Sequence, residues 1–236
     1  MAGGFIFLAR AVLPEAGGGF TALWFGVILL AVVVAVTLWR HLRDRTFLHY
    51  AVFVGSVGLM SLCNQVMEPW LVRQLGEKFD DLDNLMHVPY AVFYLLFVMQ
   101  YFRVRENFPR WALFYRIMLW IYVAALAWLG YDTMVPSDEG SAWVIMFCNL
   151  VCLLSSLVLA AVAAHEHRPG AREFLYASVP LTVSGLVLVA QFAGVVMAAG
   201  PGLLAFRLGF ILYVMIFLVA LGVRYRGIWY SQTWEG

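Results

Sequence analysis

The sequence predicts an all-α membrane protein, a bundle of seven transmembrane helices with its N-terminus outside and its C-terminus in the cytoplasm. Two observations lead to this prediction. Hydrophobic residues make up 64% of the 236-residue chain and charged residues only 12%, whereas a soluble domain is about 45–50% apolar and about 25% charged. The apolar residues also gather into runs of roughly 20, the number needed to cross a hydrocarbon core about 30 Å thick.

The first two runs, Thr21–Trp39 and Phe47–Met67, are joined by a basic turn that sets the orientation of the bundle. Neither run contains Asp, Glu, Lys or Arg, and the turn between them contains Arg40, Arg43 and Arg45. Short loops rich in Arg stay on the cytoplasmic side of a membrane. The two runs therefore predict a helical hairpin whose turn lies in the cytoplasm.

The remaining five spans follow in order, separated by short polar turns. Pro89 falls near the start of one span and Pro180 inside another, where a proline bends a helix. A proline between two glycines marks the turn at residues 199–202 before the last span. The predicted spans are Leu85–Val104, Trp111–Gly130, Ser141–Ala164, Phe174–Ala198 and Leu203–Val223.

The basic residues separate by side when the turns are assigned alternately to the two faces of the membrane. Eleven fall on the inner side and four on the outer side, and this bias over short loops places the N-terminus outside. Residues 1–20 are then a short extracytoplasmic lead-in, 21–226 the seven-helix domain and 227–236 a short cytoplasmic tail. The inner set is Arg40, Arg43, Arg45, Arg103, Arg105, Arg110, Arg116, Arg168, Arg172, Arg224 and Arg226, and the outer set is Arg10, Arg73, Lys78 and Arg207.

Four stretches resemble the membrane domain of the bacterial seven-transmembrane receptors with diverse intracellular signalling modules (7TMR-DISM). They are Leu42-Arg-Asp-Arg-Thr-Phe-Leu-His-Tyr50 in the first turn, residues 101–111 around Tyr101-Phe-Arg and Phe108-Pro-Arg-Trp, Arg168-Pro-Gly-Ala-Arg-Glu-Phe-Leu-Tyr176, and residues 207–226. The resemblance covers about residues 20 to 226.

The resemblance implies a sensor or receptor module of a bacterial inner membrane, with its N-terminus in the periplasm. Members typically carry an extracellular β-rich ligand domain before the spans and a kinase, cyclase or phosphatase module after them. With only residues 1–20 and 227–236 outside the spans, we expect either a lone sensor or adaptor domain or a piece of a longer receptor.

Polar side chains inside predicted spans are the candidates for a ligand site, because they are costly in lipid. In the third span His87, Tyr90, Tyr94 and Tyr101 recur at helical spacing and share one face. Asn64, Gln65 and Gln191 should lie in the outer half of other spans, and Asn149 is also deep. These groups either line a pocket or form hydrogen bonds between packed helices. The candidate ligand-binding set is His87, Tyr90, Tyr94, Asn64 and Gln191.

The cytoplasmic turns and the end of the last helix are the candidates for signal output. Only the last helix continues toward the side on which an output module would attach. The candidate output residues are Arg43, Asp44, Arg45, Arg105, Arg224 and Arg226.

Enzymatic and cofactor functions find little support in the sequence, so we expect no catalytic residue, cofactor or metal. His87 alone belongs to the outer side among the five histidines, which disfavours a bis-histidine haem and a Ser-His-Asp set. The last span has no Lys for a retinal Schiff base. Asp80, Asp81 and Asp83 could bind a cation, but a solvated acidic loop is the favoured interpretation. The three cysteines, at 63, 148 and 152, fit small buried apolar residues.

Two functions from different classes remain after these exclusions. One is a sensor that binds a small ligand from outside and transmits through its last helix. The other is a structural or assembly subunit of a larger membrane complex, and a membrane hydrolase is a distant third. The expected partners are the lipid bilayer and another membrane or signalling protein, including a second copy of this chain, but no nucleic acid.

Overall fold

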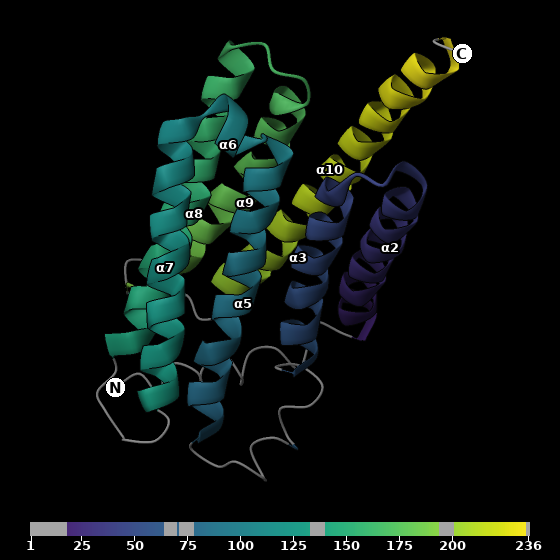
Figure 1. The fold of residues 1–236 in the computed structure, drawn as a ribbon. Helices are drawn as coiled ribbons and strands as arrows, with labels where there is room; N and C mark the ends of the chain where they lie inside the picture. Colours follow the sequence, from purple (N-terminus) through teal and green to yellow (C-terminus); the bar gives the residue numbers. More distant parts are fainter. Residues whose placement is uncertain (1–17, 64–69, 71–77, 133–139, 194–200, 235–236) are drawn as a thin grey trace. The chain divides into compact units, whose positions relative to one another are not determined.

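The structure, a computed structural model, describes residues 18–63, 70, 78–132, 140–193 and 201–234. Every regular element in this part of the chain is a helix, so the all-α prediction is confirmed there (Figure 1). The helices are α2 (Gly18–Leu42), α3 (Arg45–Leu62), α5 (Lys78–Tyr101), α6 (Val104–Asn107), α7 (Pro109–Asp132), α8 (Gly140–His165), α9 (Ala171–Phe192) and α10 (Pro201–Trp234).

Five of these helices are long and apolar enough to cross a membrane. Among the described residues, length and composition therefore identify five of the seven predicted spans. The five candidate membrane spans are Gly19–Leu42 in α2, Pro109–Trp128 in α7, Val144–His165 in α8, Ala171–Gln191 in α9 and Leu204–Gly222 in α10.

The second and third predicted spans correspond to α3 and α5, whose ends differ from the prediction. Helix α3 starts at Arg45, two residues before the predicted start, and residues 64–67 of the predicted span lie outside the described residues. Helix α5 starts at Lys78, so residues 78–84 are helical and do not belong to a loop as expected. Acidic residues near a helix N-terminus interact favourably with the helix dipole, which accounts for this earlier start.

The chain divides into two compact units, of which the first described here comprises Ile28–Cys152. In it α3 packs along α5 and α5 along α7 (Figure 1). Aromatic rings fill the α3–α5 contact: the Phe53 ring lies 5.1 Å from Tyr94 and stacks 6.3 Å from Phe97. This contact buries large apolar rings and joins the two helices firmly.

The other unit comprises Met1–Val27 with Leu153–Gly236. Its main contact joins α9 to α10, whose rings at Phe174 and Phe217 meet edge to face at 5.9 Å. Gly209 on α10 faces Ser184 and the carbonyl oxygen of Pro180 on α9. A side chain at that position would collide with both, so the glycine allows the two backbones to approach closely.

Helix α10 continues without a break to Trp234, although the sequence predicted a helix end near Val223 and a tail at residues 227–236 (Figure 1). No proline follows Pro201 in this stretch, so nothing forces the helix to stop. Its 34 residues correspond to a length of about 51 Å at 1.5 Å per residue.

Candidate functional site

Three helices of the unit Ile28–Cys152 are joined by a chain of hydrogen bonds between side chains. The Tyr122 hydroxyl on α7 donates to Asn149 Oδ1 on α8 over 2.7 Å. The Asn149 amide nitrogen donates in turn to the Tyr90 hydroxyl oxygen on α5 over 3.0 Å. Both ends of the Asn149 amide are therefore engaged, and α5, α7 and α8 each contribute one side chain.

Cys152 adds a fourth member to this chain, which we call the Tyr90–Cys152 network. Its sulfur lies 3.3 Å from the Tyr122 hydroxyl oxygen. A tyrosine has one hydroxyl proton, and here the shorter contact to Asn149 takes it, so the thiol can donate to the Tyr122 oxygen. Tyr122 and Cys152 are buried, at 0% and 2% exposed. The network thus begins in the interior of the unit.

His87 stands at the other end of the network, one helical turn from Tyr90 on α5. The two rings meet edge to face, with their centroids 5.7 Å apart and their planes at 79°. Both residues are half-buried. The network therefore runs from a buried end at Cys152 to a half-buried end at His87.

Tyr94 has a different environment from Tyr90, although the two share a face of α5. The Tyr94 ring is buried against Phe53 of α3, and Tyr101 farther along packs 5.8 Å from Phe97. The polar-aromatic face predicted for this helix thus serves two contacts. Its His87 end joins the network, while Tyr94 and Tyr101 belong to the aromatic core.

The other two candidate ligand residues are Asn64 and Gln191. Asn64 is outside the described residues. Gln191 is in the unit formed by Met1–Val27 and Leu153–Gly236, near the end of α9, where it is buried. The structure thus brings His87 and Tyr90 together, and Tyr94 lies one turn further along α5.

The turn between α2 and α3, which the sequence predicts to be cytoplasmic, has defined geometry at each of its three candidate output residues. Arg43 has a left-handed backbone, with φ 56°, and its N–H donates to the Trp39 carbonyl oxygen over 2.8 Å. Asp44 is the N-cap of α3 and accepts from the Thr46 N–H over 2.9 Å. Arg45 begins α3 with an exposed side chain. These residues end one helix and begin the next.

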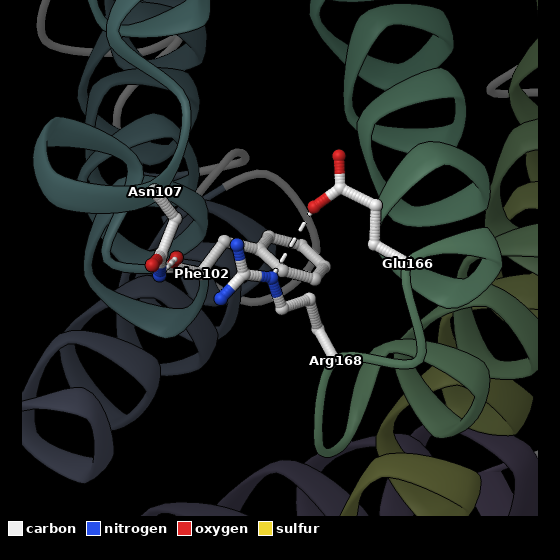
Figure 2. A network of polar contacts seen from close by, with 4 residues as sticks. All are labelled: Phe102, Asn107, Glu166 and Arg168. Atoms are coloured by element: carbon white, nitrogen blue, oxygen red, sulfur yellow. Dashed lines mark hydrogen bonds and ion pairs between the residues drawn. The ribbon is translucent and has the colours of Figure 1, made fainter.

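Arg105, the candidate in the next turn, is exposed on the short helix α6. The turn is fastened by Asn107, whose side-chain amide donates to the Phe102 carbonyl oxygen over 2.9 Å (Figure 2). In the other unit, the turn after α8 holds an ion pair between Arg168 Nε and Glu166 Oε2 at 3.3 Å (Figure 2). Both of those side chains are 44% exposed, so the pair contributes little to stability.

The remaining output candidates, Arg224 and Arg226, belong to α10. Their side chains lie outside the described part of the chain. Among the described residues no three His, Cys, Asp or Glu side chains gather in a group that could hold a metal ion. Asp80, Asp81 and Asp83 are in the first turns of α5.

The sequence predicts only part of this network. Asn149 was a candidate for a hydrogen bond between helices, and Cys152 was expected to be buried, which the structure confirms for all three cysteines. Tyr122 was not singled out. Its span is uncharged apart from Arg116, and only the assembled helices reveal that the Tyr122 hydroxyl meets Asn149.

The family described as 7TM diverse intracellular signalling matches residues 19–224. The chain belongs to this family. The resemblance predicted from the turns is thereby confirmed, and the matched region includes every member of the network. With its apolar helices, the chain is an integral membrane protein of a signalling family. No curated protein and no solved structure matches it.

Proposed function

We propose that this protein is a seven-helix sensor module of a bacterial inner membrane, with its N-terminus in the periplasm. It binds a small ligand from the outer side and transmits the event to a cytoplasmic output partner through α10 and the basic turns. It acts without catalysis and without a cofactor. The observation that carries the proposal is the family match over residues 19–224, which spans nearly all of the described helices.

The unequal distribution of basic residues between the two sides of the membrane supports the proposed orientation. This orientation in turn indicates how deep in the membrane the Tyr90–Cys152 network lies. Tyr122 lies toward the Trp128 end of its membrane-spanning segment, and Asn149 lies toward the Val144 end of the next one. Both ends face the outer side if the Arg-rich turns lie inside. The network is then in the outer half of the membrane, within reach of a ligand from the periplasm.

His87 and Tyr90 are the residues that we propose meet the ligand first. Both are half-buried, and the Tyr90 hydroxyl already accepts a hydrogen bond from Asn149. A ligand with a hydroxyl, amide or carboxylate group can exchange partners with such groups, and this gives a pocket its specificity. A change of hydrogen-bond partner at Tyr90 would alter the hydrogen bonds of Asn149 and Tyr122, and so the contact between α7 and α8.

Helix α10 supports the proposed route of output. A helix of 34 residues is about 51 Å long and exceeds the hydrocarbon core, about 30 Å thick, by about 20 Å. Its basic residues Arg224 and Arg226 then fall beyond the membrane on the cytoplasmic side. Ligand binding transmits a signal only if it favours one arrangement of this helix over another.

The alternative function is a structural or assembly subunit that binds no ligand, and one observation favours it. Both polar atoms of the Asn149 side-chain amide are satisfied within the network. Hydrogen bonds of this kind also serve simply to join helices in membranes.

Spin-label distance measurements on the full chain can separate the two functions. Labels are attached to the pair Arg105→Cys and Arg224→Cys, and the native cysteines are buried and so protected from the label. The distance distribution is recorded with amino acids, organic acids, sugars or nucleosides, one class in each sample. The sensor function predicts that one class shifts the distribution.

The matched control repeats the measurement in a His87→Ala background. A shift that disappears there supports His87 as part of the ligand site. The same distribution with every class of probe would contradict the sensor and favour the assembly subunit.

A further inference from the structure

The cytoplasmic end of α2 carries a polar hollow that is separate from the Tyr90–Cys152 network. It has a volume of about 350 Å³ and is lined by Thr37, Arg40, His41 and Arg43. All four residues are exposed. Three of the four have basic side chains, so the hollow is suited to an anion.

The hydrogen bonds around the hollow determine which of these groups can meet a ligand. His41 Nδ1 lies 2.9 Å from the Thr37 carbonyl oxygen, and a carbonyl oxygen only accepts, so Nδ1 carries a proton. In the neutral ring the second nitrogen, Nε2, then carries a lone pair and can only accept a hydrogen bond. The Thr37 hydroxyl donates to the Val33 carbonyl oxygen over 2.8 Å. An anion would therefore be held by the two arginines, with Thr37 and His41 forming part of the wall.

Among the residues that the structure describes, no carboxylate lines the hollow. Asp44, the nearest acid along the chain, accepts from the Thr46 N–H and caps α3. The left-handed backbone at Arg43 ends α2 next to the hollow, and its N–H satisfies the Trp39 carbonyl oxygen. This bond offsets part of the negative end of the helix dipole, which would otherwise oppose an anion.

The depth of the hollow indicates the source of the anion. The apolar run of α2 ends at Trp39, an aromatic residue typical of the membrane–water interface, and Arg40 follows immediately. The hollow thus lies at the level of the lipid headgroups. Basic pockets at this level recognise anionic headgroups by charge and hydrogen bonding.

We propose that Arg40 and Arg43 bind the phosphate of an anionic phospholipid in the hollow that Thr37 and His41 help to line. Free phosphate has the same chemistry, but the lipid is held at the right depth by its own acyl chains. The bound headgroup would fix the end of α2 and the turn into α3 at the membrane surface. This site is distinct from the proposed ligand site at His87. Its occupancy would depend on how much anionic lipid the surrounding leaflet contains.

The test measures the thermal unfolding midpoint of the full chain in detergent against added short-chain lipid. The probes are dioctanoyl phosphatidylglycerol, dioctanoyl phosphatidylcholine and inorganic phosphate, each titrated separately. We expect phosphatidylglycerol to raise the midpoint, because a ligand that binds only the folded state stabilises it by mass action. Phosphatidylcholine, whose phosphate is paired with a cationic choline, should produce no comparable rise.

Substitutions of the lining arginines test whether the stabilisation by phosphatidylglycerol arises from binding in the hollow. Arg40→Gln should weaken the apparent affinity for phosphatidylglycerol about tenfold, as expected for the loss of one charge-assisted contact. A double variant with Arg43→Asn should abolish the shift, and asparagine tolerates the left-handed backbone there. Arg110→Gln is the matched control, since it removes one exposed arginine from another turn and should leave the affinity unchanged.

Three results would overturn the proposal. Equal stabilisation by the two lipids would show that the acyl chains alone act. An unchanged affinity for phosphatidylglycerol in the double variant would show that the lipid does not bind in the hollow. If the double variant folds poorly, an unchanged affinity in Arg40→Gln alone would show the same. A full shift with inorganic phosphate would identify a soluble anion as the occupant, in place of a lipid.

Discussion

Tyr122 illustrates how a polar group is accommodated within apolar helices. Its ring is fully buried, and its hydroxyl group donates to Asn149 and lies beside Cys152. Lipid provides no water to replace a lost partner, but a hydrogen bond between membrane helices still contributes only about 0.6–2 kcal/mol. The network therefore adds specificity to the packing of α5, α7 and α8 more than it adds stability.

Replacing Tyr122 with Phe tests this account. The variant Tyr122→Phe should lower the free energy of unfolding by about 1 kcal/mol, because Asn149 Oδ1 loses its donor. The measurement is a denaturant titration in mixed micelles. Tyr176→Phe, at a position 65% exposed, removes the same hydroxyl group from the surface and should change little. Equal losses in the two variants would contradict the network.

Gly209 shows a second way in which one residue determines a helix contact. The variant Gly209→Ala should destabilise the protein by about 1–3 kcal/mol, the usual cost of overpacking. Its Cβ would come within 2.6 Å of the Ser184 Cβ and 2.7 Å of the Pro180 carbonyl oxygen. Gly222→Ala is the control on the same helix, because nothing lies within 4 Å of that position. Thermal unfolding of both in detergent makes the comparison, and a neutral Gly209→Ala would disprove the close approach.

At the scale of the elements, the first turn links two helices by local chemistry alone. Arg43 ends α2 through its left-handed backbone, and Asp44 caps α3 through its carboxylate. The same two residues are candidates for signal output, so their structural role must be separated from any signalling role.

Two substitutions at Asp44 separate these roles. Asp44→Ala should cost about 1 kcal/mol of stability, because the Thr46 N–H loses the cap. Asp44→Asn keeps an accepting oxygen and should retain most of that stability while removing the negative charge. Unfolding midpoints give the first comparison. If the asparagine variant is as unstable as the alanine variant, the charge and not the cap is what matters at this position.

At the scale of the whole molecule, the orientation of the chain rests on its arginines. Eleven basic residues are assigned to the inner side and four to the outer side, and we expect this excess to keep the inner turns in the cytoplasm during insertion. The direction of α10, and so the route of any output, depends on this assignment.

A reporter fused after Gly236 tests the orientation in intact bacterial cells. A green fluorescent protein, which folds in the cytoplasm, should fluoresce, and an alkaline phosphatase at the same position should be inactive. The triple variant Arg40→Gln, Arg43→Asn and Arg45→Gln removes three positive charges from the first turn and should weaken the preference of this turn for the cytoplasm. Phosphatase activity in the unaltered protein would reverse the proposed topology.

The sequence by itself determined the class of the protein, five apolar spans, the basic turns and the family. These properties depend on composition and on short runs of residues, and a run such as Thr21–Trp39 is apolar whatever its neighbours are. The sequence also placed His87, Tyr90 and Tyr94 on one face of α5, because helical spacing is local.

Only the tertiary structure decided what each of those side chains meets. Tyr90 reaches Asn149, 59 residues away along the chain, while Tyr94 packs on Phe53. Such partners depend on which helices are neighbours and on how each is rotated about its axis, and these are set by the packing of many side chains at once. For the same reason Tyr122 and Gly209 looked ordinary in the sequence and became specific contacts only when α7 met α8 and α9 met α10.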